Sequence, residues 1–167
     1  MTRNRMWWSA AVVLLIGAGA GAAVAWWARP GHNDFTEAAG AEGATALQTG
    51  DGWVLEAAQV AGEPCSRVRI GARSTTCMSL HFPAGSGQFG EVQGLGHRFV
   101  VVAWASATPV SAAIFTSRSL GAEHRMVSAA TGVYVVAVEL QPGEEAWGVH
   151  VLDADRAVVL NGSLLPP

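Results

Sequence analysis

The stretch Val133–Leu140, VYVVAVEL, decides the fold of this chain. It is dense in valine, and β-branched and aromatic side chains favour extended backbone. The turn signal Gln-Pro-Gly-Glu at 141–144 ends it. Arg98–Ala105, RFVVVAWA, is a second apolar run, and its continuity indicates a central strand. The two runs predict a β domain.

The remainder of the chain after Gly52 repeats this character. Short β-rich runs alternate with Gly, Pro, Ser and Thr at a spacing of about ten residues, which is typical of antiparallel sandwiches. We therefore predict a mainly β, immunoglobulin-like or Greek-key β-sandwich over residues 52–163, followed by a tail at 164–167. Residues 118–124 are predicted as a turn region. The other predicted strands are Trp53–Val60, Ser66–Arg73, Cys77–Phe82, Phe89–Val92, Val110–Thr116, Arg125–Ser128, Ala146–Leu152 and Ala157–Leu160.

An uncharged apolar segment, Met6–Ala28, precedes this domain. As a helix at about 1.5 Å per residue it would be roughly 34 Å long, enough to cross a hydrocarbon core of about 30 Å. Indole rings favour the headgroup level of a bilayer, and Trp7 and Trp8 mark one end of the segment, Trp26 and Trp27 the other. The segment is therefore predicted as a single transmembrane helix.

The charges around this helix predict its orientation. Arg3 and Arg5 precede it in a cytoplasmic stub of residues 1–5, and all 13 acidic residues follow it. The positive-inside tendency then places the C-terminal domain outside the plasma membrane. A cleaved signal peptide is the alternative, because Ala23-Val24-Ala25 forms an A-x-A site after which cleavage would follow Ala25. The length of the segment and its second Trp pair favour the uncleaved anchor.

Two further expectations concern the chain around the anchor. Gly17 and Gly21 form a G-x-x-x-G pattern that lets two helix backbones approach, so a helix-mediated homodimer is one expectation. Gly and Ala are abundant throughout the chain, so the spacing also arises by chance. Residues 29–51 contain few large apolar side chains and are predicted as a flexible stalk.

The expected redox state of the two cysteines, Cys65 and Cys77, depends on this topology. In an oxidising exterior they are expected to form a disulfide, worth about 3 kcal/mol in the chain-entropy model. The alternative is a pair of reduced, buried thiols.

Four segments resemble membrane-anchored ectodomains of actinobacteria, a largely uncharacterised family. They are GWVLEAAQVAGEPC from Gly52, FGEVQGLGHRFVVVAWASATPVSAAIFTS from Phe89, GVYVVAVEL from Gly132 and WGVHVLDADRAVVLNG from Trp147. The resemblance spans Gly52–Gly162. The chain departs from the family pattern at 153–156, where the hairpin lacks Gly, and at 150–152, where no aromatic residue leads the strand. The resemblance implies an extracytoplasmic location and a β fold, and almost nothing about activity.

Catalytic and metal-binding patterns are weak throughout. A G-x-S-x-G elbow is missing, because Ser86 is one register out of place and its flanks are not strand then helix. The five histidines are scattered, without metal-ligand spacing. Asp153 and Asp155 lack the further ligands of a calcium loop. No cofactor, metal site or catalytic residue is predicted.

The sequence therefore favours a non-catalytic, membrane-anchored interaction module with an envelope or membrane protein partner. The acidic exterior argues against nucleic acid as a partner. A cell-wall carbohydrate-binding module is one alternative, with Trp53 and Trp147 as the candidate platform. The other is a secreted hydrolase whose site forms only in three dimensions, for example around His81, His97 or His150.

Overall fold

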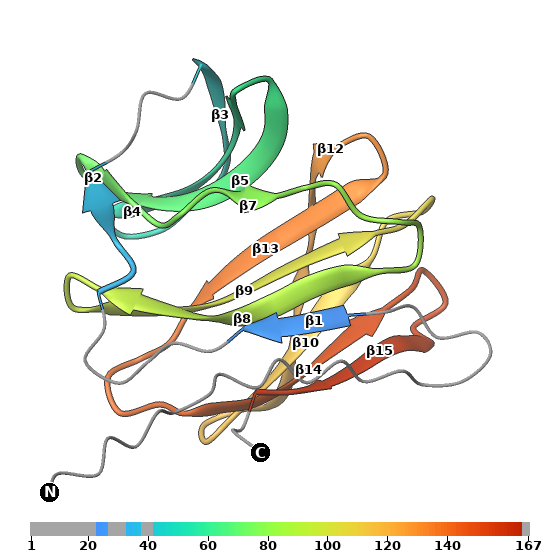
Figure 1. The fold of residues 1–167 in the computed structure, drawn as a ribbon. Coiled ribbons are helices and arrows are strands. Elements are labelled where there is room, and N and C mark those ends of the chain that lie inside the picture. The colour runs from blue at the N-terminus through green and yellow to red at the C-terminus, as the bar shows by residue number, and fades with distance from the viewer. Residues whose placement is uncertain (1–22, 27–32, 38–41, 165–167) are drawn as a thin grey trace, which may run out of the picture.

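The computed structural model describes residues 23–26, 33–37 and 42–164, and within these ranges the regular structure is all β (Figure 1). Hydrogen bonds join the strands into three sheets. Sheet A has the order β1-β8-β9-β13-β12, with β1 Ala23–Trp26, β8 Gly87–Gly94, β9 His97–Ala105, β12 Val127–Ala130 and β13 Val133–Glu139. Sheet B has the order β2-β6-β5-β4-β3, with β2 Thr36–Glu37, β3 Glu42–Thr49, β4 Trp53–Val60, β5 Glu63–Ile70, β6 Arg73–Ser74, and β7 Met78–Ser79 paired to β5. Sheet C has the order β11-β10-β14-β15, with β10 Ser111–Thr116, β11 Leu120–Arg125, β14 Ala146–Leu152 and β15 Val158–Ser163.

The three sheets stack as layers, with sheet A between the other two (Figure 1). Along β9, Val100, Val102 and Trp104 belong to the core shared with sheet C. Phe99 and Val101, which point to the opposite face of β9, belong to the core shared with sheet B. Successive side chains of a strand point to opposite faces, so a strand covered on both sides must be apolar at every position. This is the physical reason for the unbroken apolar runs in β9 and β13.

Tight hairpins set the register of two strand pairs. Ala61 and Gly62 join β4 to β5, and Leu95 and Gly96 join β8 to β9. All four residues have positive φ, between 52° and 84°. Two successive positive φ values are those of a type I′ turn, whose twist matches the flanking strands. Glycine at the second position is what makes each turn inexpensive.

The predicted mainly β fold with antiparallel sheets is confirmed, but the number of layers differs from the two of an immunoglobulin-like sandwich. β1 and β8 also form a parallel pair. Most of the residues predicted as a turn region belong to β11, which lies at an edge of sheet C and is largely exposed. Of the predicted strand at 77–82, only Met78–Ser79 is extended in a ladder. The predicted tail begins inside the core, because Leu164 is buried.

The predicted stalk at 29–51 is in part a component of sheet B. β2 and β3 lie within it, and Phe35 is 2% exposed in the core between sheets A and B. The side-chain amide of Gln48 bonds to the backbone of Ala137 in sheet A, donating to its carbonyl at 2.9 Å and accepting from its N–H at 3.2 Å. One buried ring and one amide therefore tie a segment of otherwise weak hydrophobicity to the middle layer.

The predicted membrane segment falls mainly outside the described residues. Positions 6–22 and 27–28 lie outside the described ranges. They include Trp7, Trp8 and Trp27 together with Gly17 and Gly21. The four residues of β1, Ala23–Trp26, are described as a strand beside β8 rather than as helix. In the described ranges, no helix is long and apolar enough to cross a membrane.

Candidate functional site

The outer face of sheet C carries a cluster of three rings, from Phe115, Trp147 and His150. The centroid of Phe115 lies 5.2 Å from that of Trp147 and 4.5 Å from that of His150. Phe115 comes from β10, and the other two come from β14, which pairs with it. Their strand neighbours Ile114 and Val149 point into the core. Alternation along the strands directs Phe115 and His150 outward. Trp147 has no register partner on β10, because the pairing shifts between Gly148 and Ala146, and this bulge brings its ring to the same side as Phe115. We call these three residues the aromatic face.

Two glycines shape the surface around Phe115. A Cβ at Gly121 would lie 2.9 Å from the Phe115 ring, and one at Gly148 would lie 3.8 Å from it. Gly148 is the register partner of Phe115. The ring therefore lies over bare backbone on both sides.

Exposed apolar side chains gather on the same sheet. In the described part of the chain five large hydrophobic residues are exposed, and three of them, Leu120, Trp147 and Val158, belong to sheet C. Leu120 is 89% exposed and pairs in register with Phe115, so both side chains lie on one face. Apolar side chains exposed in a group mark interaction surfaces, whereas single ones need no explanation.

Polar groups border the aromatic face on both sides. On β15, Asn161 lies opposite His150. On β11, the carboxylate of Glu123 accepts hydrogen bonds from Ser111 at 2.7 Å and from Arg156 at 2.6 Å. An apolar centre with a polar border is the usual composition of a binding surface.

The predicted disulfide is present. Cys65 of β5 and Cys77, beside β7, are joined with a Cα–Cα distance of 5.5 Å. The bridge ties the segment before β7 to β5 of sheet B.

A buried ion-pair network lies on β4 and β5. The carboxylate of Glu56 accepts a hydrogen bond from Arg67 at 2.7 Å and one from Arg69 at 3.0 Å. Burial raises the pKa of Glu56, but the hydrogen bonds from Arg69 and Arg67 outweigh it, so the pKa lies below its ordinary value. Arg67 is buried, at 7% exposure, because Glu56 neutralises its charge.

A second carboxylate fixes the turn before β14. Glu144 accepts hydrogen bonds from the hydroxyl of Thr116 and from the backbone N–H of Gln141. These two bonds hold the pKa of Glu144 below its ordinary value. Glu144 is therefore buried and structural.

The two tryptophans proposed as a carbohydrate platform lie in different parts of the fold. Trp53 is 5% exposed between sheets A and B, and its indole N–H donates to Glu139 at 2.8 Å. Trp147 alone of the pair is exposed, on sheet C. They do not form one surface.

The histidines named for a hydrolase site are likewise dispersed. His81 is exposed, with Nδ1 3.7 Å from Glu63. His97 of sheet A contacts Glu139 at 2.6 Å, and His150 is part of the aromatic face. Ser86 donates its hydroxyl proton to the Pro83 carbonyl at 2.6 Å.

The remaining acids of the sequence analysis close a turn. Asp153 accepts hydrogen bonds from the backbone N–H groups of Asp155 and Ala157, which is a local turn arrangement. Among the described residues, no group of three or more His, Cys, Asp or Glu is placed to hold a metal ion.

No protein-family model, curated protein or solved structure matches this chain. The candidate site therefore rests on its own geometry. Of the aromatic face, Trp147 and His150 were considered from the sequence, but Phe115 was not. The alternation of β10 places it outward, yet only the pairing of β10 with β14 brings it to the other two rings.

Proposed function

We propose that this protein is a non-catalytic interaction module of the cell exterior, and that it binds an envelope or membrane protein through the aromatic face. The observation that carries the proposal is the group on sheet C in which the exposed Trp147 and Leu120 lie beside the half-buried Phe115. Tryptophan is among the side chains that contribute most to protein interfaces when a partner desolvates it. The border that includes Glu123 and Arg156 supplies charged groups around the apolar centre.

The location is part of the same proposal. The uncharged segment at 6–28, the arginines before it and the resemblance to anchored ectodomains support a single-pass protein with its C-terminal domain outside the plasma membrane. The disulfide supports an oxidising compartment. An immunoglobulin-like or Greek-key arrangement would apply to sheets A and C, which face each other across one core.

The test uses photo-crosslinking from the full chain in its own membrane. Leu120→p-benzoylphenylalanine places the reactive group beside Phe115. Val60→p-benzoylphenylalanine is the matched control, because Val60 is also an exposed apolar residue, at 41%, but lies on sheet B. We expect a protein adduct from position 120 that Trp147→Ala removes. Equal adducts from both positions, or an adduct insensitive to Trp147→Ala, would refute the proposed face.

A cell-wall polysaccharide is the second candidate ligand. One observation favours it: His150 packs against the Phe115 ring and lies in register with Asn161. Imidazole and amide groups therefore stand near an aromatic ring, as in a surface that both stacks on a sugar and bonds to its hydroxyls. Co-sedimentation of the full chain with insoluble peptidoglycan tests it. Retention that Trp147→Ala abolishes would favour the polysaccharide, and absence of retention would leave the protein partner.

A further inference from the structure

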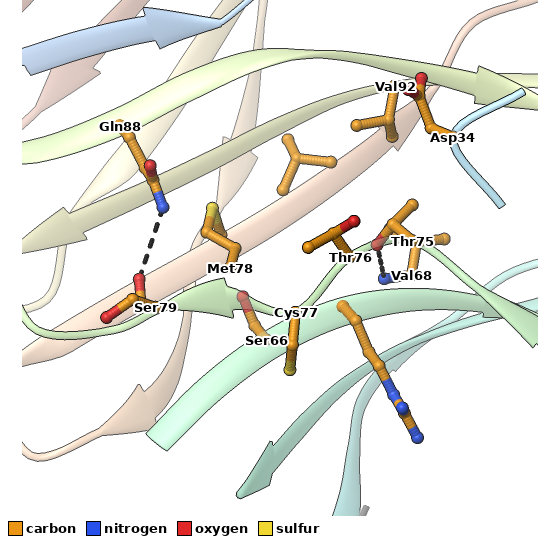
Figure 2. Close-up of a pocket in the computed structure, with 12 residues that line it drawn as sticks. Asp34, Ser66, Val68, Thr75, Thr76, Cys77, Met78, Ser79, Gln88 and Val92 are labelled. Carbon is orange, nitrogen blue, oxygen red and sulfur yellow. Dashed lines mark hydrogen bonds between the residues drawn. The ribbon is translucent and has the colours of Figure 1, made fainter. Parts of the chain in front are cut away.

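A cavity of about 380 Å³ lies between sheets A and B, apart from the aromatic face (Figure 2). β5 contributes Ser66 and Val68 to its wall, and β8 contributes Gln88 and Val92. The segment from Thr75 to Ser79 forms another side. The volume is at the small end of the range of about 300–1,000 Å³ that ligand pockets occupy.

Most of the wall is apolar and firmly placed. Val68, Val92 and Val101 are each less than 9% exposed in the core between the two sheets. The backbone N–H of Val68 donates to Thr75 Oγ1 at 3.1 Å, and the Cys65–Cys77 bridge holds the segment that follows Thr75. The cavity is therefore preformed, so a ligand does not have to order its walls.

Among the polar residues of this wall, Ser66 has a buried hydroxyl without a partner. It is 1% exposed, and in the described part of the chain its Oγ has no hydrogen-bond partner. Leaving a buried hydroxyl unpaired costs about 1–3 kcal/mol. Figure 2 shows the Ser66 hydroxyl directed to the side where Met78 lies. Met78 is half-buried and unbranched, so it can shift to admit a group that bonds to the hydroxyl.

The two ends of the cavity differ. At one end the Gln88 side-chain amide donates to the Ser79 carbonyl at 3.4 Å, a long and exposed bond that opens at little cost. At the other end lies the carboxyl of Asp34, which accepts from the backbone N–H of Gln93 at 2.8 Å. A negative group inside a ligand would meet Asp34 as a like charge.

We propose that this cavity binds a small neutral or cationic molecule that has an aliphatic body and one hydrogen-bonding head. The valines enclose the body, and Ser66 bonds to the head. Asp34 selects against anions, because the charge of Arg67, which also lines the cavity, is already neutralised by Glu56. The site is independent of the aromatic face, so either can fail without the other.

The test titrates three probes of equal chain length, hexan-1-ol, hexylamine and hexanoate, into the isotopically labelled full chain in bicelles. Backbone amide resonances of Val68, Val92 and Val101 report binding. We expect saturable shifts with hexan-1-ol and hexylamine, and affinity for hexanoate at least about tenfold weaker. Partition into the bicelle is the same for every variant, so variants are compared at equal free probe concentration.

Two serine variants separate binding from folding. Ser66→Ala removes an unpaired hydroxyl, so its urea midpoint is expected to equal or exceed that of the wild type, while hexan-1-ol binds about three- to tenfold more weakly. Ser86→Ala is the control, because Ser86 is also buried but bonds to Pro83 outside the cavity. It is expected to leave the affinity unchanged. If the three valines show no saturable shifts, only water occupies the space at Ser66 and the proposal is overturned. An affinity for hexan-1-ol that Ser66→Ala does not lower overturns it as well.

Discussion

Replacing Glu56 by glutamine removes the negative charge that accepts hydrogen bonds from both Arg67 and Arg69. The shape of the side chain is kept, so the change tests charge rather than packing. Arg67 stays buried, at 7% exposure, and cannot reach bulk water without opening sheet B. The variant therefore leaves a buried guanidinium without a counter-charge.

The size of the effect follows from this geometry. Breaking a buried ion pair by removing one partner costs about 3–5 kcal/mol. Glutamine still offers one acceptor oxygen, which places the expected loss at the lower end, about 3 kcal/mol. The side chain of Arg69 is 37% exposed, so water screens its share of the interaction and adds little.

Urea unfolding of the full chain in a non-ionic detergent at pH 7 measures this loss. The buried indoles of Trp53 and Trp104 give the fluorescence signal. We expect the midpoint to fall and the slope to stay the same, since the unfolded surface is unchanged. Glu63→Gln is the matched control: its side chain is 72% exposed and lies 3.7 Å from His81, so its loss is expected to stay within about 0.5 kcal/mol.

The pH dependence gives an independent check. The folded pKa of Glu56 lies below its ordinary value of 4.5, so the contribution of Glu56 is complete above that value and is lost as the pH falls through the folded pKa. The difference in unfolding free energy between wild type and Glu56→Gln should therefore hold from pH 7 to about 5 and narrow below. A loss under about 1 kcal/mol at pH 7, or a loss equalled by Glu63→Gln, would show that this network does not stabilise the fold.

Three other predictions address separate parts of the molecule. The double change Cys65→Ser and Cys77→Ser should lower the unfolding free energy by about 3 kcal/mol in urea titrations, and an unchanged midpoint would contradict the chain-entropy argument. Gly87→Ala would put a Cβ 2.0 Å from a backbone oxygen of β9 and should lower the unfolding free energy by about 3 kcal/mol. Gly148→Ala, whose Cβ would have its nearest contact at 3.5 Å, should lower it by less than about 1 kcal/mol. Similar urea midpoints for the two variants would count against this packing. Burial lowers the pKa of His124, so as the pH falls the unfolded chain takes up the proton at a higher pH than the folded chain, and stability decreases below about pH 6.5. His124→Gln should flatten that part of the curve of stability against pH. Parallel curves for the variant and the wild type would refute this prediction.

Individual strands were predictable where one local signal dominates. The valine-rich run of β13 and the continuous run of β9 were identified from composition, and the observed bounds of β4 and β14 are those predicted. β11 was missed because an exposed edge strand needs no apolar alternation. β2 and β3 were missed because their attachment depends on Phe35 and Gln48, whose partners lie far along the chain.

The candidate sites depended more heavily on tertiary structure. Sequence alone could not separate Trp53 from Trp147, because both follow turns and begin strand-like runs; the fold buries one and exposes the other. Phe115 and Leu120 become part of the candidate site only because β10 pairs with β11 and β14. The cavity beside Ser66 is a property of two sheets and a disulfide together, and β5 by itself gives no sign of it.

By itself the sequence determined that the described domain is β, where its strongest strands lie, and that its two cysteines pair if the compartment is oxidising. Those properties depend on local backbone preference, on period-two patterning, and on a residue count. Only the tertiary structure decided that there are three layers, that part of the predicted stalk completes sheet B, and which rings and hydroxyls share a surface. The physical reason is that strand pairing joins residues distant in the chain, and side-chain burial is settled by what packs on each face of the resulting sheet rather than by neighbours in sequence.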